Sequence, residues 1–351
     1  MSTSFSWLHL TDFHQGADKQ YLGKGVNHRF FESLKTLHQK CGPWDLVIFT
    51  GDLTNRGSAN EFQELNQFLE ELWEQFRQLQ NPLPKLLAVP GNHDLARPKK
   101  KSSELEILTK WANHPDAQEE FWNNEKSSYR KLIDKVFKNY THWLTEQPFQ
   151  AEGLRYSRLL PGDFSYTFEK DNAKLGIIGL NTAFLQLNSD NYEGRLVLDA
   201  YRQFNVACHD NDGPKWAKQH HAWLIMTHHP REWLTETHRE QLNEIINDHD
   251  NFAVHLCGHL HEAAYTRIGV AGTKIKNIWQ GRSLFGLEYF NGKEQRSHGY
   301  TAGKIELDGD KRILTIWPRL DHHYRNAGRK VIPDYLSIYL TDDLHTEPVS
   351  F

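Results

Sequence analysis

Six short apolar segments constrain the fold of this chain more than any other feature. They lie at residues 5–10, 45–50, 85–89, 174–180, 222–227 and 252–257. Continuous apolar runs of this length are typical of strands that are buried on both faces of a sheet. Segments of helical periodicity, near 26–40 and 61–79, separate the first three runs. Strands that alternate with helices in this way predict an α/β fold with a largely parallel sheet.

Residues 97–160 break this alternation. They are polar and mostly helical in pattern, with aromatic side chains that we expect to anchor them: Trp111, Phe121, Trp122, Phe137, Tyr140 and Trp143. We expect a helical cap, inserted between core strands beside the loop that precedes it.

Strand-like segments return after residue 262, at 263–270, 273–280, 299–307 and 312–317. Gly309-Asp310 predicts a hairpin between the last two. We expect these strands to complete a second sheet packed on the first, within one domain of residues 1–318. Residues 319–351 have weak periodicity, and we expect a C-terminal tail or the start of a linker.

Composition narrows the classes of partner. The 351 residues include 41 Lys and Arg and 45 Asp and Glu, for a formal net charge of −4. This balance gives no overall attraction to nucleic acid or to a membrane, although a local basic groove is compatible with it. Three distant cysteines, Cys41, Cys208 and Cys257, predict reduced thiols in a cytoplasmic protein. Because no apolar stretch has the length of a membrane span and no signal-peptide pattern is present, we expect no membrane partner.

Polar side chains follow five of the six apolar runs, at the point where each predicted strand ends. The residues are Asp12 and His14, Gly51-Asp52, 91-GNHD-94, His228-His229, and 258-GHLH-261. Because ligand sites in open α/β sheets form at the carboxyl ends of the strands, these loops are expected to converge. Within Asp12-x-His14 and His259-x-His261, an extended backbone would point both side chains to the same side.

Carboxylate, imidazole and amide groups together suit divalent transition metals. The candidate ligands are Asp12, His14, Asp52, Asn92, His228, His259 and His261. Seven groups are too many for one ion with an open position, and they suit two ions that share a bridging carboxylate. Each short motif alone has a common structural explanation, such as a turn, but their joint occurrence at strand ends favours a two-metal site. Gly51, Gly91 and Gly258 would let the backbone pass close to a crowded centre.

With these motifs in this order, the sequence resembles the calcineurin-like metallophosphoesterase superfamily, whose pattern is D-x-H, G-D, G-N-H-[DE], a lone His, and G-H-x-H. The resemblance covers about residues 5–318 and implies a four-layer αββα sandwich of two mixed sheets with the metals at one edge. It implies one metal held by Asp12, His14, Asp52 and His261, and a second held by Asp52, Asn92, His228 and His259. It also implies that His93 binds no metal but contacts the phosphate and assists the leaving group, while Asp94 orients it.

The neighbouring histidine leaves one ligand open. His228 is favoured because it leaves the strand first, but His229 could replace it, or could face substrate at the rim together with Arg231. The resemblance implies two divalent transition metal ions, Mn²⁺ foremost, with Fe, Zn²⁺ and Ni²⁺ also compatible with the ligands.

The expected reaction is phosphoester hydrolysis by metal-activated hydroxide, with a small or nucleotide-like phosphodiester as the preferred substrate. The segment 51-GDLTNRG-57 is similar to the G-D-L-T-D-x-G motif of class III cyclic-nucleotide phosphodiesterases, with Asn55 in place of the usual Asp.

Three alternatives stay open: a nuclease on DNA or RNA, a phosphomonoesterase, and a non-catalytic interaction module. For the nuclease, Lys126, Arg130, Lys131, Lys135 and Lys138 would form a basic helix face. Whether the chain is fused to, or associates with, a larger regulatory protein also stays open. The sequence does not predict an oligomeric state.

Overall fold

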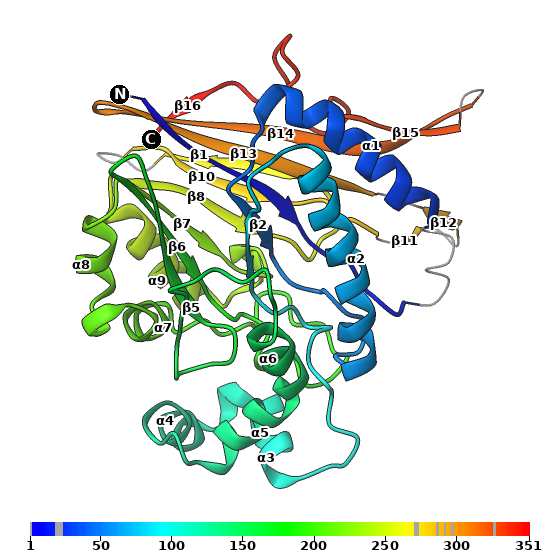
Figure 1. Ribbon diagram of the computed structural model, residues 1–351. Helices are drawn as coiled ribbons and strands as arrows, with labels where there is room; N and C mark the ends of the chain where they lie inside the picture. The colour runs from blue at the N-terminus through cyan, green and yellow to red at the C-terminus, as the bar shows by residue number, and fades with distance from the viewer. Residues whose placement is uncertain are drawn as a thin grey trace.

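The computed structural model describes residues 2–17, 24–269, 274–285, 288–290, 293–295, 298–325 and 328–351. Over these residues it contains two seven-stranded mixed sheets that pack face to face, with helices on both outer faces (Figure 1). The α/β fold with four αββα layers that the sequence predicted is therefore confirmed.

The first sheet is formed by β1 (Thr3–Leu10), β2 (Leu46–Phe49), β3 (Lys85–Ala88), β13 (Gly299–Asp308), β14 (Lys311–Tyr324), β15 (Gly328–Pro333) and β16 (Val349–Ser350). Its order is β15-β14-β13-β1-β2-β3, and β16 pairs with β14. β1, β2 and β3 are parallel, whereas β13 is antiparallel to β1. In β1, Phe5 and Trp7 lie in the core between the sheets, and Leu8 and Leu10 pack on the helix side. Both faces of the strand are buried, which explains its continuous apolar run.

The second sheet is formed by β4 (Arg155–Tyr156), β5 (Phe164–Lys170), β6 (Ala173–Gly179), β7 (Ala222–Met226), β8 (Phe252–Cys257), β9 (Ala264–Ile268) and β10 (Lys276–Gln280). Its order is β4-β5-β6-β7-β8-β10-β9, and β6, β7, β8 and β10 are parallel. A separate two-stranded sheet pairs β11 (Glu288–Phe290) with β12 (Lys293–Gln295).

Helices form the two outer layers. α1 (Lys24–Cys41) and α2 (Ala59–Gln78) cover the first sheet, and α7 (Ala200–Ala207), α8 (Gly213–Lys218) and α9 (Glu236–Asn247) cover the second (Figure 1). One-turn helices η3 (His209–Asn211) and η4 (Arg231–Trp233) lie between them in the chain. The start of α2 is fixed by a capping box, in which the Ser58 hydroxyl accepts from Glu61 N and the Glu61 carboxylate accepts from Ser58 N.

The late strands divide between the two sheets, which the sequence did not predict. β9 and β10 complete the second sheet beside β8, as expected, but β13 and β14 extend the first sheet beside β1. Trp7 of β1 lies opposite Gly303 of β13, where a Cβ would come within 2.4 Å of the indole ring. Gly303 thus makes room for a large side chain in the core between the sheets. The predicted hairpin at Gly309-Asp310 is confirmed by the pairing of Asp308 with Lys311.

Residues 97–160 contain α3 (Ser103–Thr109), η2 (Trp111–Asn113), α4 (Pro115–Asn123), α5 (Ser128–Val136) and α6 (Lys138–Thr145), which together we call the cap. The cap lies below the sandwich in Figure 1. α6 fastens it to the core: Tyr140 Oη donates to Ala88 O at 2.9 Å, and Asn139 Nδ2 donates to Gly57 O at 2.8 Å. Of the expected aromatic anchors, Phe121, Phe137 and Tyr140 are fully buried.

The segment after residue 318 contributes strands to the first sheet. Residue 318, where the sequence suggested that the domain ends, lies within β14, and β15 and β16 both pair with that strand. Phe351 is buried in the core between the sheets. The weak periodicity of this segment reflects short elements separated by turns, and not a tail.

The three cysteines are free, as the sequence predicted, and all three are buried. Over the described part of the chain, no helix combines the length and the apolar character that a membrane span requires.

Candidate metal centre

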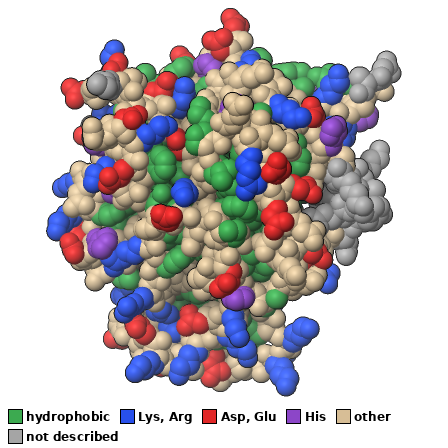
Figure 2. Space-filling view, viewed as in Figure 1, with side chains coloured by type: hydrophobic (Ala, Val, Ile, Leu, Met, Phe, Trp, Pro, Cys, Tyr) green, Lys and Arg blue, Asp and Glu red, His purple; other side chains and the backbone are tan. Residues whose placement is uncertain are grey.

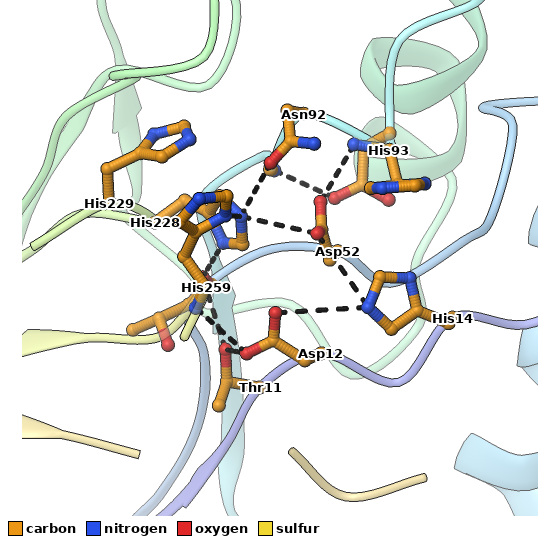
Figure 3. A network of polar contacts seen from close by, with 12 residues as sticks. Thr11, Asp12, His14, Asp52, Asn92, His93, His228, His229 and His259 are labelled. Carbon is orange, nitrogen blue, oxygen red and sulfur yellow. Dashed lines mark hydrogen bonds and ion pairs between the residues drawn. The ribbon is translucent and has the colours of Figure 1, made fainter. Parts of the chain in front are cut away.

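The loops that follow β1, β2, β3, β7 and β8 meet at one edge of the sandwich (Figure 3). Backbone hydrogen bonds join the first two loops, from Asp12 N to Gly51 O at 3.0 Å and from His14 N to Asp52 O at 2.9 Å. Another joins the last two, from Gly258 N to His228 O at 2.9 Å. The predicted convergence of the strand ends is therefore observed, and backbone contacts hold it.

Five of the seven candidate ligands have a positive φ. The angles are 52° for Asp12, 50° for His14, 52° for Asp52, 75° for His259 and 58° for His261. The extended backbone that the sequence predicted for Asp12-x-His14 and His259-x-His261 is wrong, because β1 ends at Leu10 and β8 at Cys257. Left-handed backbone is uncommon for residues other than glycine, and such strain concentrates at functional sites.

Three ligand atoms form a first cluster. His14 Nε2 lies 3.1 Å from His261 Nε2, and Asp12 Oδ1 lies 3.3 Å from His261 Nε2 and 3.9 Å from His14 Nε2. His14 and His261 are partly exposed, whereas Asp12 is fully buried. Solvent therefore reaches this cluster from the histidine side.

A second cluster surrounds His228. Its Nε2 lies 3.1 Å from Asn92 Oδ1, 3.2 Å from His259 Nδ1 and 3.3 Å from Asp52 Oδ2. The other ring nitrogen of His228, Nδ1, donates to Thr50 O at 2.8 Å, so Nε2 is the nitrogen available to a cation.

Asp52 lies between the two clusters. Oδ2 is 3.3 Å from His228 Nε2 and 3.8 Å from His14 Nε2, while Oδ1 accepts from His93 N at 2.8 Å (Figure 3). One carboxylate oxygen thus faces both sets of ligands, and the backbone amide of His93 orients the other.

These residues fit a pair of divalent cations. Two ligands that each lie about 2.1 Å from one cation are about 3.0–3.4 Å apart at tetrahedral or octahedral angles, close to most distances within each cluster. Burial opposes ionisation of both carboxyls, but the neighbouring imidazoles keep the pKa of Asp12 and of Asp52 below its ordinary value. Burial lowers the pKa of His14 to about 4 and of His259 to about 3, so both rings are neutral, as ligation requires.

His228 responds in the opposite direction. Burial opposes its protonation, but the Asp52 carboxylate outweighs burial and raises the pKa of His228 to about 9. Positive charge is therefore favoured beside Asp52, and a cation bound there would displace the His228 proton.

His93 lies beside the clusters, with its ring centroid 4.8 Å from that of His14. Its Nδ1 is 2.8 Å from Asn55 O. A carbonyl cannot donate, so Nδ1 carries a proton and donates it to Asn55 O. The family resemblance implied that Asp94 orients His93, but the His93 ring contacts the Asn55 carbonyl.

Asp94 instead ties two loops together. Its carboxylate accepts from the backbone amides of Gly91, Leu53 and Thr54 at 2.9, 3.2 and 2.8 Å, and from the Thr54 hydroxyl at 3.0 Å. Burial and the nearby Asp52 carboxylate raise the pKa of Asp94 to about 7. Asp94 therefore positions the loops that carry Asp52 and His93.

His229 does not face substrate together with Arg231, but a ring nitrogen of His229 lies within 4.8 Å of ring nitrogens of His228 and His259, so the alternative that His229 is a ligand stays open. His229 is buried, and its Nδ1 is 2.8 Å from the Thr182 hydroxyl, so it does not face substrate at a rim. Its Nε2 has no hydrogen-bond partner among the described residues. The Arg231 guanidinium donates to Glu232 Oε1 and Asn243 Oδ1.

Several contributors were not found from the sequence. Thr11 donates its hydroxyl to Asp12 Oδ2 at 2.7 Å, and Ser283 donates to Asp12 O at 2.9 Å. The Trp233 ring packs edge-on against His259, with centroids 4.0 Å apart. The contact of Thr11 could have been predicted because Thr11 is next to Asp12 in the sequence. Ser283 and Trp233 are not part of any metal-ligand motif, so no sequence signal identified them.

The predicted role of the glycines is observed. At Gly258, a Cβ would lie 1.9 Å from the Thr11 hydroxyl oxygen, and at Gly51 it would lie 2.6 Å from His228 Nδ1. Gly51 also has a φ of 92°, a backbone conformation that residues other than glycine rarely adopt.

Comparison with protein families gives a match to the model of the calcineurin-like phosphoesterases over residues 5–263, a range that contains every candidate ligand. The chain belongs to the calcineurin-like phosphoesterase family. Membership implies a phosphoester hydrolase, and the Asp and His clusters are able to hold the metal ions that such an enzyme uses. The resemblance stated from the motifs alone is thereby confirmed.

Solved structures similar to this calcineurin-like phosphoesterase include a dimetal phosphatase from Danio rerio, at 12% identity and a TM-score of 0.43, covering 93% of this chain and 98% of that one. A hypothetical protein from Thermus thermophilus matches at 10% identity and a TM-score of 0.43, covering 91% and 99%. Vps29 from Chaetomium thermophilum matches at 11% and 0.34, covering 99% and 98%. The search of curated proteins found no match.

Proposed function

We propose that this protein is a dinuclear metal-dependent phosphodiesterase that hydrolyses a small or nucleotide-like phosphodiester. The observation that carries the proposal is the position of Asp52 Oδ2, 3.3 Å from His228 Nε2 on one side and 3.8 Å from His14 Nε2 on the other. A carboxylate oxygen between two ligand clusters is the arrangement that a pair of bridged cations requires. We place the enzyme in the cytoplasm because its three buried thiols are free.

In this proposal one cation is held by Asp12, His14, Asp52 and His261, and the other by Asp52, Asn92, His228 and His259. When bound, two divalent cations supply positive charge against the phosphate oxygens and lower the pKa of water, so that it loses a proton and can attack as hydroxide. Mn²⁺ suits this mixture of oxygen and nitrogen ligands, and Fe, Zn²⁺ and Ni²⁺ are also compatible with it.

His93 is the proposed proton donor. Since Nδ1 donates to Asn55 O, Nε2 carries a proton only when the ring is doubly protonated. In that form His93 can deliver the Nε2 proton to the leaving oxygen, while the Asn55 carbonyl keeps the ring in place. Because its backbone amide also donates to Asp52 Oδ1, the proton donor is fixed relative to the bridging carboxylate.

The preference for a diester is supported by the segment 51-GDLTNRG-57, which is similar to the motif of class III cyclic-nucleotide phosphodiesterases. Asn55 replaces the usual Asp of that motif. Its contact with His93 is made through the backbone carbonyl, which any residue supplies. The substitution therefore leaves the support of His93 intact.

A nuclease is the second candidate, and the surface of the cap favours it. Lys126, Lys131, Lys135 and Lys138 are exposed there, and Figure 2 shows Lys and Arg side chains around the lower end of the molecule, with acidic side chains among them. Arg130 does not contribute, because it is buried with its guanidinium 5.4 Å from the Phe121 ring centroid. The basic face that the sequence suggested is thus smaller by one charge.

The experiment is an activity panel with metal-loaded enzyme and a His93→Gln variant. It compares bis(p-nitrophenyl) phosphate with p-nitrophenyl phosphate, then cyclic nucleotides with single- and double-stranded DNA and RNA. We expect hydrolysis of small diesters and cyclic nucleotides. Activity confined to monoesters would overturn the proposal, and activity confined to nucleic acids would establish the nuclease instead.

The same panel tests the role of His93. We expect His93→Gln to lower kcat about 10²–10⁴-fold on esters with alkoxide leaving groups, which need a proton, and far less on p-nitrophenyl esters. Bound metal, measured by elemental analysis, should be unchanged. An equal loss on both kinds of leaving group, or loss of metal, would show that His93 is not the proton donor.

A further inference from the structure

A cavity of about 560 Å³ lies between the cap, the segment 185–197 and the start of α9. Small-molecule sites have volumes of about 300–1,000 Å³. Lys110 and Trp111 of the cap, Tyr192 and Arg195 of the connecting segment, and His238 of α9 are among the residues that line it. The cavity therefore draws its walls from three parts of the chain.

The chemistry of the walls favours an aromatic ligand with hydrogen-bond acceptors. Among the residues that the structure describes, no Asp or Glu lines the cavity, although the whole chain has a net charge of −4. Arg195 lies over the Tyr192 ring, with Cζ 5.4 Å from the ring centroid. The Glu106 carboxylate, 2.8 Å from the Lys110 ammonium, partly neutralises the charge of Lys110. Arg195 is therefore the more important positive charge in the cavity. Planar guanidinium and aromatic groups stack on nucleobases, and arginine donates to their carbonyl and ring nitrogen acceptors.

Two paths of contact connect the cavity with the metal centre. Leu196, within the lining segment, donates from its backbone amide to Trp233 O at 3.0 Å, and the Trp233 ring packs against His259. On the other side, Arg97 donates to Asn92 O at 3.5 Å and is close enough to Tyr192 to interact with its hydroxyl electrostatically. On the first path Trp233 lies between the segment 185–197 and His259, and on the second path Arg97 lies between Tyr192 and Asn92.

We propose that this cavity binds the nucleoside of a nucleotide diester whose phosphate lies at the metal centre. The inference rests on the proposed phosphodiesterase function and names its substrate class. The base stacks on the Trp111 ring, and Arg195, whose guanidinium covers the Tyr192 ring, donates to its acceptor atoms. A diester without an aromatic group leaves the cavity unused and gains no binding from it.

Two diesters with the same p-nitrophenolate leaving group test this proposal: thymidine 5′-(p-nitrophenyl phosphate) and methyl p-nitrophenyl phosphate. We expect wild-type enzyme to have the lower KM for the thymidine ester. Arg195→Gln and Trp111→Leu should each raise that KM about tenfold, the effect of losing one cation–π or stacking contact, and leave the methyl ester unchanged. Arg77→Gln, at an exposed arginine at the end of α2, is the matched control and should change neither KM.

The outcomes separate the cavity from the chemistry. Equal KM values for both esters in wild-type enzyme, or equal effects of the cavity variants on both, would overturn the cavity proposal. Hydrolysis of neither ester would overturn the phosphodiesterase function. In that case calorimetric binding of thymidine 5′-monophosphate still decides the cavity: weaker binding by Arg195→Gln and Trp111→Leu supports it, and unchanged binding contradicts it.

Discussion

At the scale of single residues, Gly91 shows how little space separates the loops of the metal centre. A Cβ at this position would lie 2.2 Å from Asp52 Oδ1 and 2.4 Å from Asp52 N. Gly91→Ala should therefore displace the bridging carboxylate. We expect about 1–3 kcal/mol of lost stability, as for other overpacked sites, together with at least tenfold weaker metal binding, the effect of about 1.4 kcal/mol.

Calorimetric titration with Mn²⁺ measures the effect of Gly91→Ala on binding, and urea unfolding measures its effect on stability. Gly269 is the matched control, because a Cβ there would meet no atom within 4 Å. Gly269→Ala should bind metal as the wild type does. Wild-type affinity in Gly91→Ala would show that Asp52 is not held by close contact with this loop.

The candidate ligands were predictable because side chains carry their chemistry in the sequence. Asp12, Asp52 and His228 each lie within two residues of the end of an apolar run, and the ends of parallel strands share an edge. The hydrogen bond that orients His93 was not predictable, because its acceptor is the backbone carbonyl of Asn55. Every residue type has such a carbonyl, so the sequence does not mark it. The positive φ of the ligands was equally hidden, since it is uncommon for residues other than glycine and depends on the surrounding structure.

At the scale of elements, Asp163 joins β5, the loop after β6 and α7. Its carboxylate accepts from Asn181 N at 2.7 Å and from Gln203 Nε2 at 3.2 Å. Burial raises the pKa of Asp163 to about 8, above the roughly 3.9 of an unfolded chain. Between these values the folded protein holds a proton that the unfolded protein has lost, so stability decreases as the pH rises towards 8.

Asp163→Asn removes this ionisation, and its stability should lack that part of the pH dependence. Urea unfolding of both proteins between pH 5 and 8 should show the wild type losing stability relative to the variant, by about 1 kcal/mol per pH unit. Parallel stability curves for the two proteins would contradict the buried, protonated state of Asp163.

Ten of the strands were predictable from local pattern, but their partners were not. The sequence did not predict the remaining strands: β4, β5, β11, β12, β15 and β16. The segments 273–280 and 299–307 both have a strand-like pattern, yet β10 pairs with β8 and β13 pairs with β1. The choice depends on fits between residues far apart in the chain, such as Trp7 opposite Gly303. A pattern within one segment holds no information about such a fit.

At the scale of the whole molecule, the last residues of the chain complete the core between the two sheets. Phe351 is 3% exposed, and the neighbouring Val349 pairs with Leu314 of β14. Phe351→Ala should cost about 3–5 kcal/mol of stability, as do other aromatic truncations in cores. Tyr339→Ala, at a residue that is 87% exposed, is the control and should change stability by less than about 0.5 kcal/mol.

Thermal and urea unfolding compare these two variants directly. Similar small losses in both would mean that the C-terminal segment is not packed in the core. Only a large loss that is specific to Phe351→Ala agrees with a first sheet that extends beyond residue 318.

The central claim is that five loops of the sandwich together hold two cations through Asp52. Counting bound metal per chain by native mass spectrometry, in wild type and in Asp52→Ala, tests it most directly. We expect two divalent ions in the wild type and neither in Asp52→Ala, because the bridging oxygen serves both clusters. Asp343→Ala, at an exposed carboxylate, should keep both ions. Two tightly bound ions in Asp52→Ala, or a single ion in the wild type, would contradict the account.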